Sequence, residues 1–165
     1  MSRRRLASLL MSIGVLAAPG VAAACSCAWA GPFAKVALAT DLVVLADVRS
    51  YHRHGMDLAV IEVLKGEEDR PAIRVWGDTG ALCRPYVTAF PGGTRWILAL
   101  EREPGTHDYA ISICGDYWLE VRGAQAVGRI TVAKPGTIKE STPLADLLAW
   151  VRSGGATPLA PAPLR

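Results

Sequence analysis

The chain has 165 residues, a formal net charge of +3 and 51% hydrophobic residues. Arg3, Arg4 and Arg5 account for three of its 18 cationic residues, so the remainder carries 15 Lys and Arg against 15 Asp and Glu. This balance removes the electrostatic argument for an anionic membrane surface or a nucleic acid, and we expect no nucleic-acid partner.

The N-terminal segment, residues 1–24, has the pattern of a cleaved signal peptide. Three arginines precede an apolar stretch over Leu6–Leu16, and Ala22–Ala24 supply the small residues that a signal peptidase recognises. The stretch is short for a transmembrane helix, which needs about 20 apolar residues. We therefore expect an exported protein, extracellular or periplasmic, whose mature chain begins at Cys25.

Short strands separated by turn residues follow. The apolar or alternating segments are Leu42–Val48, Leu58–Leu64, Ala72–Trp76, Arg95–Leu100 and Tyr109–Cys114. No helical pattern separates them, which favours an antiparallel barrel or sandwich over a parallel sheet. Five principal strands predict an all-β fold built on a five-stranded OB-type antiparallel barrel, with a small sandwich as the alternative.

The segments on either side of these strands predict little further regular structure. Ala28–Ala39 is expected to be a connector, and Val127–Val132 a further short strand. One flanking helix is predicted near the C-terminus, with Thr142 as its N-cap and Pro143 as its first residue. Its apolar stripe at helical spacing is Leu144, Leu147, Leu148 and Val151. The domain is expected to span 25–153, with 154–165 as a disordered Ala/Pro-rich tail.

The chain contains four cysteines, Cys25, Cys27, Cys83 and Cys114. An even number after a signal peptide predicts two disulfides, because export leads to an oxidising compartment. A bond between Cys25 and Cys27 would close a strained ring, so each is expected to pair with a distant cysteine. The alternative is a Cys-x-Cys metal site, but the spacing matches no zinc pattern, and we expect no metal of the protein's own.

Signal cleavage would leave the α-amino group of Cys25 free. An α-amine has a pKa of about 7.7–8.0, so a metal can compete for its proton near neutral pH. The amine nitrogen and the Cys25 carbonyl oxygen would then chelate a metal ion. A catalytic zinc keeps one open position, normally filled by water, which a rigid chelating terminus could displace. Ser26 would point outward, towards a substrate pocket.

At these residues the chain resembles the N-terminal, netrin-like domain of the tissue inhibitors of metalloproteinases. The resemblance covers about residues 25–118 and includes the signal peptide before it. The matching motifs are Cys25-Ser26-Cys27, Phe33 followed by Thr40-Asp41-Leu42-Val43, Lys65-Gly66, Ile73-Arg74, and the later Cys83 and Cys114.

The resemblance implies an OB-type barrel with disulfides Cys25–Cys83 and Cys27–Cys114. It implies an inhibitor rather than an enzyme, with no cofactor and no catalytic residues, whose partner is a zinc metalloprotease. Cys25 would chelate the zinc of the target. The implied protease contacts are Ser26, Cys27 and Ala28, with Ala81 and Leu82 as a second ridge.

Two alternatives stay open. Netrin-like modules also occur as binding domains without inhibitory activity, and no cysteines remain here for the third disulfide usual in the family's domain. A lipoprotein signal also ends at a cysteine, although Ala22 stands where a leucine is usual. Acylation of Cys25 would block chelation, and lipidation of its sulfur would prevent a disulfide. Only in that case do we expect a membrane association.

Overall fold

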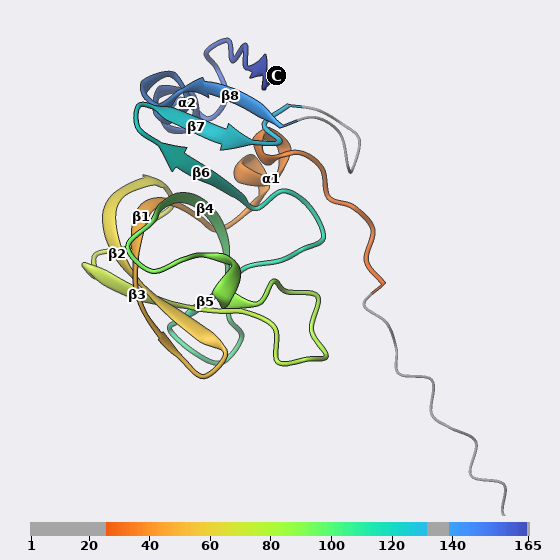
Figure 1. Ribbon diagram of the computed structural model, residues 1–165, viewed down its shortest axis with the longest axis vertical. Coiled ribbons are helices and arrows are strands. Elements are labelled where there is room, and N and C mark those ends of the chain that lie inside the picture. Colours follow the sequence, from red (N-terminus) through yellow and green to blue (C-terminus); the bar gives the residue numbers. More distant parts are fainter. Residues whose placement is uncertain (1–25, 132–138, 165) are drawn as a thin grey trace, which may run out of the picture.

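The computed structural model describes residues 26–131 and 139–164. Figure 1 shows the barrel strands β1–β5 on one side and β6–β8 with α2 on the other, with α1 between them. The elements are α1 (Phe33–Ala39), β1 (Leu42–His52), β2 (Gly55–Lys65), β3 (Ala72–Trp76), the 3₁₀ helix η1 (Val87–Ala89), β4 (Arg95–Arg102), β5 (Tyr109–Ala110), β6 (Trp118–Arg122), β7 (Gln125–Gly128), β8 (Glu140–Pro143), α2 (Leu144–Arg152) and β9 (Ala162–Pro163).

The first five strands close into a barrel, which confirms the predicted fold class. They lie in the order β1-β2-β3-β5-β4, and β1 pairs with β4 to complete the ring. These pairings are antiparallel except for β3 with β5, which is parallel. The apolar runs Leu42–Ala46 and Trp96–Leu100 pair with each other and are buried throughout. These two strands therefore form the centre of the hydrophobic core.

Strand β5 is shorter than the sequence predicts. The alternating pattern runs to Cys114, yet the strand contains only Tyr109 and Ala110. Beyond it the chain turns, and the Ile113 amide donates to the Cys83 carbonyl at 3.0 Å. The turn that includes Ile113 and Cys114 therefore replaces the strand residues that the alternation alone predicts.

The expected connector over Ala28–Ala39 contains helix α1, a departure from the sequence prediction. Its short apolar stripe, Phe33, Val36 and Ala37, is fully buried. Lys65 closes the C-terminal end, because its Nζ donates to the carbonyl oxygens of Leu38, at 2.8 Å, and Thr40. A stripe of three residues is too short to be recognised as helical before its tertiary partners are known.

Gly66, after this lysine, has a φ of +83° and packs against the backbone of Asp41. A Cβ at Gly66 would lie 2.3 Å from the Asp41 carbonyl oxygen. The Lys65-Gly66 motif thus has a structural role at the junction of α1 and β1.

The chain beyond the barrel extends the sheet through β6, β7, β8 and β9. Helix α2 buries Leu147, Trp150 and Val151. Leu147 and Val151 belong to the predicted apolar stripe, whereas Trp150 does not. Its N-cap is Pro143, whereas Thr142 lies in β8 opposite Ala126, so the predicted cap is corrected. The short strand predicted over Val127–Val132 is β7, Gln125–Gly128, so it begins earlier and ends at Gly128; of the predicted range, Val132 lies outside the described residues.

The expected disordered tail also differs from the structure. Residues 162–163 form β9 alongside β8, and Leu159 packs against the core. The composition of the tail could not indicate this, because Leu159 packing and pairing with β8 are both tertiary contacts. No helix among the described residues is long and apolar enough to cross a membrane.

Candidate functional site

A disulfide between Cys27 and Cys114 ties the first described residues to the barrel. The two residues are 87 apart in sequence and their Cα atoms are 5.7 Å apart. This confirms one predicted pairing. Cys83 is also disulfide-bonded, and its predicted partner, Cys25, lies outside the described residues.

The sulfur atoms of Cys27, Cys83 and Cys114 all lie within 4.8 Å of one another. Three clustered sulfurs can indicate a metal site, but a metal ligand must be a thiolate. Cys27 and Cys114 are bonded to each other and cannot supply one. The cluster is therefore a place where three chain segments meet, two of them joined by the Cys27–Cys114 disulfide.

Hydrogen bonds join the same three segments. The Ala30 amide donates to the Cys114 carbonyl at 2.5 Å, and the Cys114 amide donates to Ser112 Oγ at 3.0 Å. The Ile113–Cys83 bond described above adds the third segment. We call the surface formed by residues 26–30, 78–86 and 112–114 the cysteine edge.

The loop before Cys83 is shaped by Asp78. One of its carboxylate oxygens, Oδ1, accepts hydrogen bonds from the amides of Gly80 and Leu82, both at 2.9 Å. These amides, Leu82 first, hold the pKa of the Asp78 carboxyl below its usual range. The ionised side chain therefore stabilises the turn that presents Ala81 and Leu82.

The predicted contact residues Ser26, Cys27, Ala28, Ala81 and Leu82 are all exposed. Ala81 and Leu82 directly precede Cys83, whose sulfur adjoins that of Cys27. The structure thus places residues 26–28 close to the second ridge, Ala81 and Leu82. Cys25, the predicted zinc-chelating residue, lies outside the described residues.

Two exposed apolar residues of the cysteine edge were not foreseen from sequence. Tyr86 is 62% exposed and Ile113 is 45% exposed, and Leu82 joins them at 39%. Strand alternation does not indicate them, because both lie outside the strands. Their closeness in sequence to Cys83 and Cys114 was the available signal.

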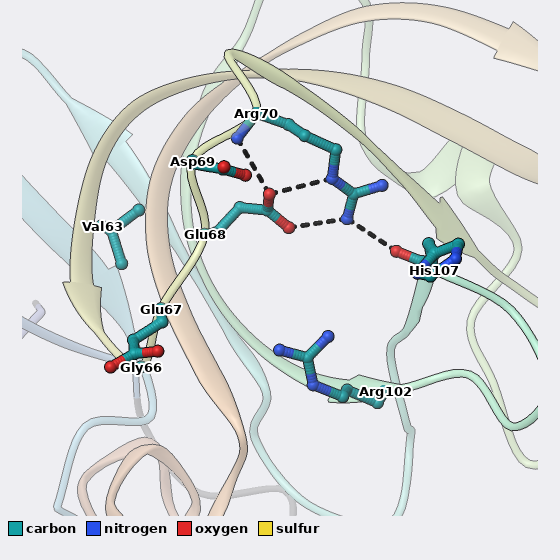
Figure 2. Close-up of a pocket in the computed structure, with 8 residues that line it drawn as sticks. All are labelled: Val63, Gly66, Glu67, Glu68, Asp69, Arg70, Arg102 and His107. Carbon is teal, nitrogen blue, oxygen red and sulfur yellow. Dashed lines mark hydrogen bonds and ion pairs between the residues drawn. The ribbon is translucent and has the colours of Figure 1, made fainter.

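A separate pocket of about 790 Å³ lies beside the loop after β2. Figure 2 shows Glu68 and Arg70 as an ion-paired fork, with Arg102 directed into the cavity from below. Arg70 Nε and Nη2 donate to the Glu68 carboxylate at 2.9 and 2.6 Å, and Nη2 also donates to the His107 carbonyl at 2.6 Å. The Tyr109 hydroxyl completes the network by donating to Glu68 at 2.9 Å.

This network leaves Glu68 poorly suited to proton transfer. The Arg70 guanidinium, against the opposing effect of burial, lowers the pKa of Glu68 to about 2. A carboxyl with that pKa stays ionised near neutral pH, whereas a general acid or base works best with a pKa near the operating pH. The pocket is lined by charged side chains, but the Glu68 carboxylate is already hydrogen-bonded to Arg70 and Tyr109.

No protein-family model matches the chain, and no curated protein matches it.

Proposed function

We propose that this protein is an exported inhibitor of a zinc metalloprotease, which it binds through the cysteine edge. The observation that carries the proposal is the Cys27–Cys114 disulfide, which holds exposed Ser26 and Ala28 against the barrel. The resemblance to the tissue inhibitors of metalloproteinases, argued above from the sequence, supports the same surface.

The cysteine edge is suited to binding because its backbone is already ordered. A disulfide and several backbone hydrogen bonds constrain it before any partner arrives. Such preorganisation improves affinity because less conformational entropy is lost on association. Tyr86 adds an exposed aromatic side chain, a residue type that frequently dominates binding energy at interfaces.

The inhibitory chemistry is assigned to Cys25, which directly precedes this edge. Its free amine and carbonyl oxygen would chelate the target's zinc and displace the bound water. Ser26 would enter the adjoining specificity pocket, while Ala81 and Leu82 form the second ridge. Anchoring of Cys27, two residues from Cys25, supports a short and constrained reach to the metal.

The chelation mechanism is tested by lengthening the N-terminus. The mature protein beginning at Cys25 is compared with a variant carrying one extra alanine before it, after intact mass has verified a free amine. We expect the native form to inhibit at least one zinc protease of a broad panel. The extension should weaken inhibition by about a hundredfold or more, because it removes the terminal amine from the chelate.

Several results would count against this proposal. Absence of inhibition across the panel would show that the protein is not an inhibitor of these proteases. Equal inhibition by both forms would show that chelation by the terminal amine is not the mechanism. A mass increase at Cys25 matching lipid chains would identify a membrane-anchored protein. Binding without inhibition would assign the edge to a non-inhibitory netrin-like module.

The contact surface is tested by a matched pair of substitutions. Ile113 and Ile61 are each 45% exposed, but Ile61 lies on β2, outside the cysteine edge. We expect Ile113→Ala to weaken binding of the inhibited protease by about tenfold and Ile61→Ala to leave it unchanged. Equal effects of the two substitutions would exclude the cysteine edge as the interface.

A further inference from the structure

A second pocket, of about 330 Å³, lies on the sheet formed by β4, β6 and β7. In the strand register Trp96 is opposite Glu120, and Glu120 is opposite Val127. Directly paired residues project from the same face, as do residues two apart on one strand. Trp118 therefore shares this face with Trp96, Glu120 and Val127, and all four line the pocket.

The pocket has an aromatic floor that is rigidly held. The Phe90 ring meets Trp96 edge-on at a centroid distance of 5.0 Å and Trp118 at 5.4 Å. Trp96 Nε1 donates to Thr94 Oγ1 at 2.6 Å. Among the described residues no group accepts from Trp118 Nε1, so this donor can bond to solvent or to a ligand.

The rim carries charges of both signs. Arg129 Nε and Nη2 contact Asp116 Oδ1 at 2.8 and 2.5 Å. Glu120 uses one oxygen to pair with Arg122 at 2.6 Å, and its other oxygen has no donor within the described part of the chain. Lys139 lines the pocket without a carboxylate at ion-pair distance among those same residues.

Asp116, which also lines the pocket, has an unsatisfied acceptor. The residue is only 7% exposed, and its Oδ2 is buried without a hydrogen-bond partner in the described structure. A buried polar atom without a partner is uncommon in folded proteins and calls for an explanation, such as a missing ligand or solvent molecule.

The charges restrict the class of ligand. The two acids, Asp116 and Glu120, and the two bases, Arg129 and Lys139, give the lining no net charge, so the rim favours neither an anion nor a cation. A neutral molecule with an apolar face would pack on the indoles, while hydroxyl groups could both donate to Glu120 and accept from Lys139. The volume lies near the lower end of the range of about 300–1,000 Å³ usual for ligand pockets.

We propose that this pocket binds a neutral pyranose sugar, with the C–H face of the ring on the tryptophan floor and its hydroxyls on the charged rim. Pyranoses combine an apolar face with hydroxyl groups that donate and accept. This site is separate from the cysteine edge and does not depend on protease inhibition.

The proposal is tested by titrating the mature protein with N-acetylglucosamine and glucose, followed by tryptophan fluorescence and saturation-transfer NMR. Glucosamine and glucuronate serve as cationic and anionic comparators. We expect saturable binding of at least one neutral sugar, and binding of the charged sugars that is weaker by about tenfold. Lack of saturable binding by both neutral sugars, or tightest binding of either charged sugar, would overturn the proposal.

Variants locate the binding. Trp118→Leu should abolish it, whereas Trp76→Leu should not, because Trp76 lies on β3 and is bonded to Asp108. Should Trp118→Leu fail to fold, Lys139→Gln provides the test, since the exposed Lys139 side chain belongs to the rim of the pocket and not to the core. Lys139→Gln should weaken binding by about fivefold. Unchanged sugar binding by the folded Lys139→Gln variant would show that the sugar does not bind in this pocket.

Discussion

The cysteine edge and the Glu68 pocket are both loop regions at the rim of one barrel, yet they are held together differently. A disulfide, backbone hydrogen bonds and the Asp78 carboxylate order the cysteine edge, on which Leu82, Tyr86 and Ile113 are exposed. The Glu68 pocket is ordered by its own charged side chains, because Glu68 binds Arg70 and Tyr109. The Glu68 pocket has a cavity of about 790 Å³, but its Glu68 carboxylate is already hydrogen-bonded within the protein.

This difference shows why cavity size is a poor guide to function here. A side chain that stabilises its own loop must break that interaction before it can bind a partner. A loop constrained through its backbone and a disulfide can present its side chains at no such cost. The cysteine edge is therefore the better candidate for partner binding.

The largest effect is expected from removing the covalent constraint. The double variant Cys27→Ala with Cys114→Ala should lose up to about 4–5 kcal/mol of unfolding free energy, because the disulfide closes a long loop. Urea unfolding measures the change. Alkylation and mass analysis of the unmodified protein provide the control, since they establish that the bond was formed. An unchanged urea midpoint would mean that this disulfide does not constrain the unfolded chain.

A smaller and pH-dependent effect is expected at the Glu68 pocket. Glu68→Gln should cost about 2 kcal/mol at neutral pH, a value reduced for the partial exposure of Arg70. The folded pKa of Glu68 is depressed from 4.5 to about 2, so its stabilisation is complete above the unfolded value. It is lost as the pH falls from 4.5 towards 2.

Thermal unfolding across this pH window measures the Glu68 contribution. The matched control is Glu67→Gln, since Glu67 lies in the same loop and is exposed. The difference in stability between the Glu68 variant and the unmodified protein should shrink as the pH falls. A constant difference across the window would show that ionisation of Glu68 is not the cause.

The smallest effect on stability is expected at Asp78. Asp78→Ala removes the acceptor for two amides of the cysteine edge, so the amides of Gly80 and Leu82 should exchange hydrogen faster while global unfolding changes little. Binding of a target protease should weaken by about fivefold. The depressed pKa of Asp78 means that the turn is stabilised above the usual carboxyl pKa and weakened as the pH falls through the folded value.

Exposed Asp69, in the other loop, is the control for this substitution, and Asp69→Ala should leave both the exchange rates and the binding unchanged. Slow exchange of both amides in the Asp78 variant would show that the turn is ordered by other contacts.

Much of the barrel was predictable because strand patterns are local. Ala72–Trp76 appears as predicted, and the continuous apolar run within Arg95–Leu100 forms the buried part of β4. Helix α1 and strand β9 were missed. Both depend on docking against the core rather than on a long periodic pattern.

The candidate site was predictable only in part. Ser26, Ala28, Ala81 and Leu82 were proposed as contacts from the resemblance, and they are exposed beside the cysteine cluster. The exposure of Tyr86 and Ile113 is not predictable from strand alternation, because Tyr86 directly precedes η1 and Ile113 lies in the turn after β5.

The strand segments and the α2 stripe can be inferred from the amino-acid sequence, since both are patterns among neighbouring residues, and the positions of the cysteines are read from it directly. Tertiary structure alone decided that three cysteine sulfurs meet, that Glu68 is bound by Arg70 and Tyr109, and that two tryptophans share one pocket. Each of these depends on barrel closure and on the register between strands, which bring together residues that are distant in the chain.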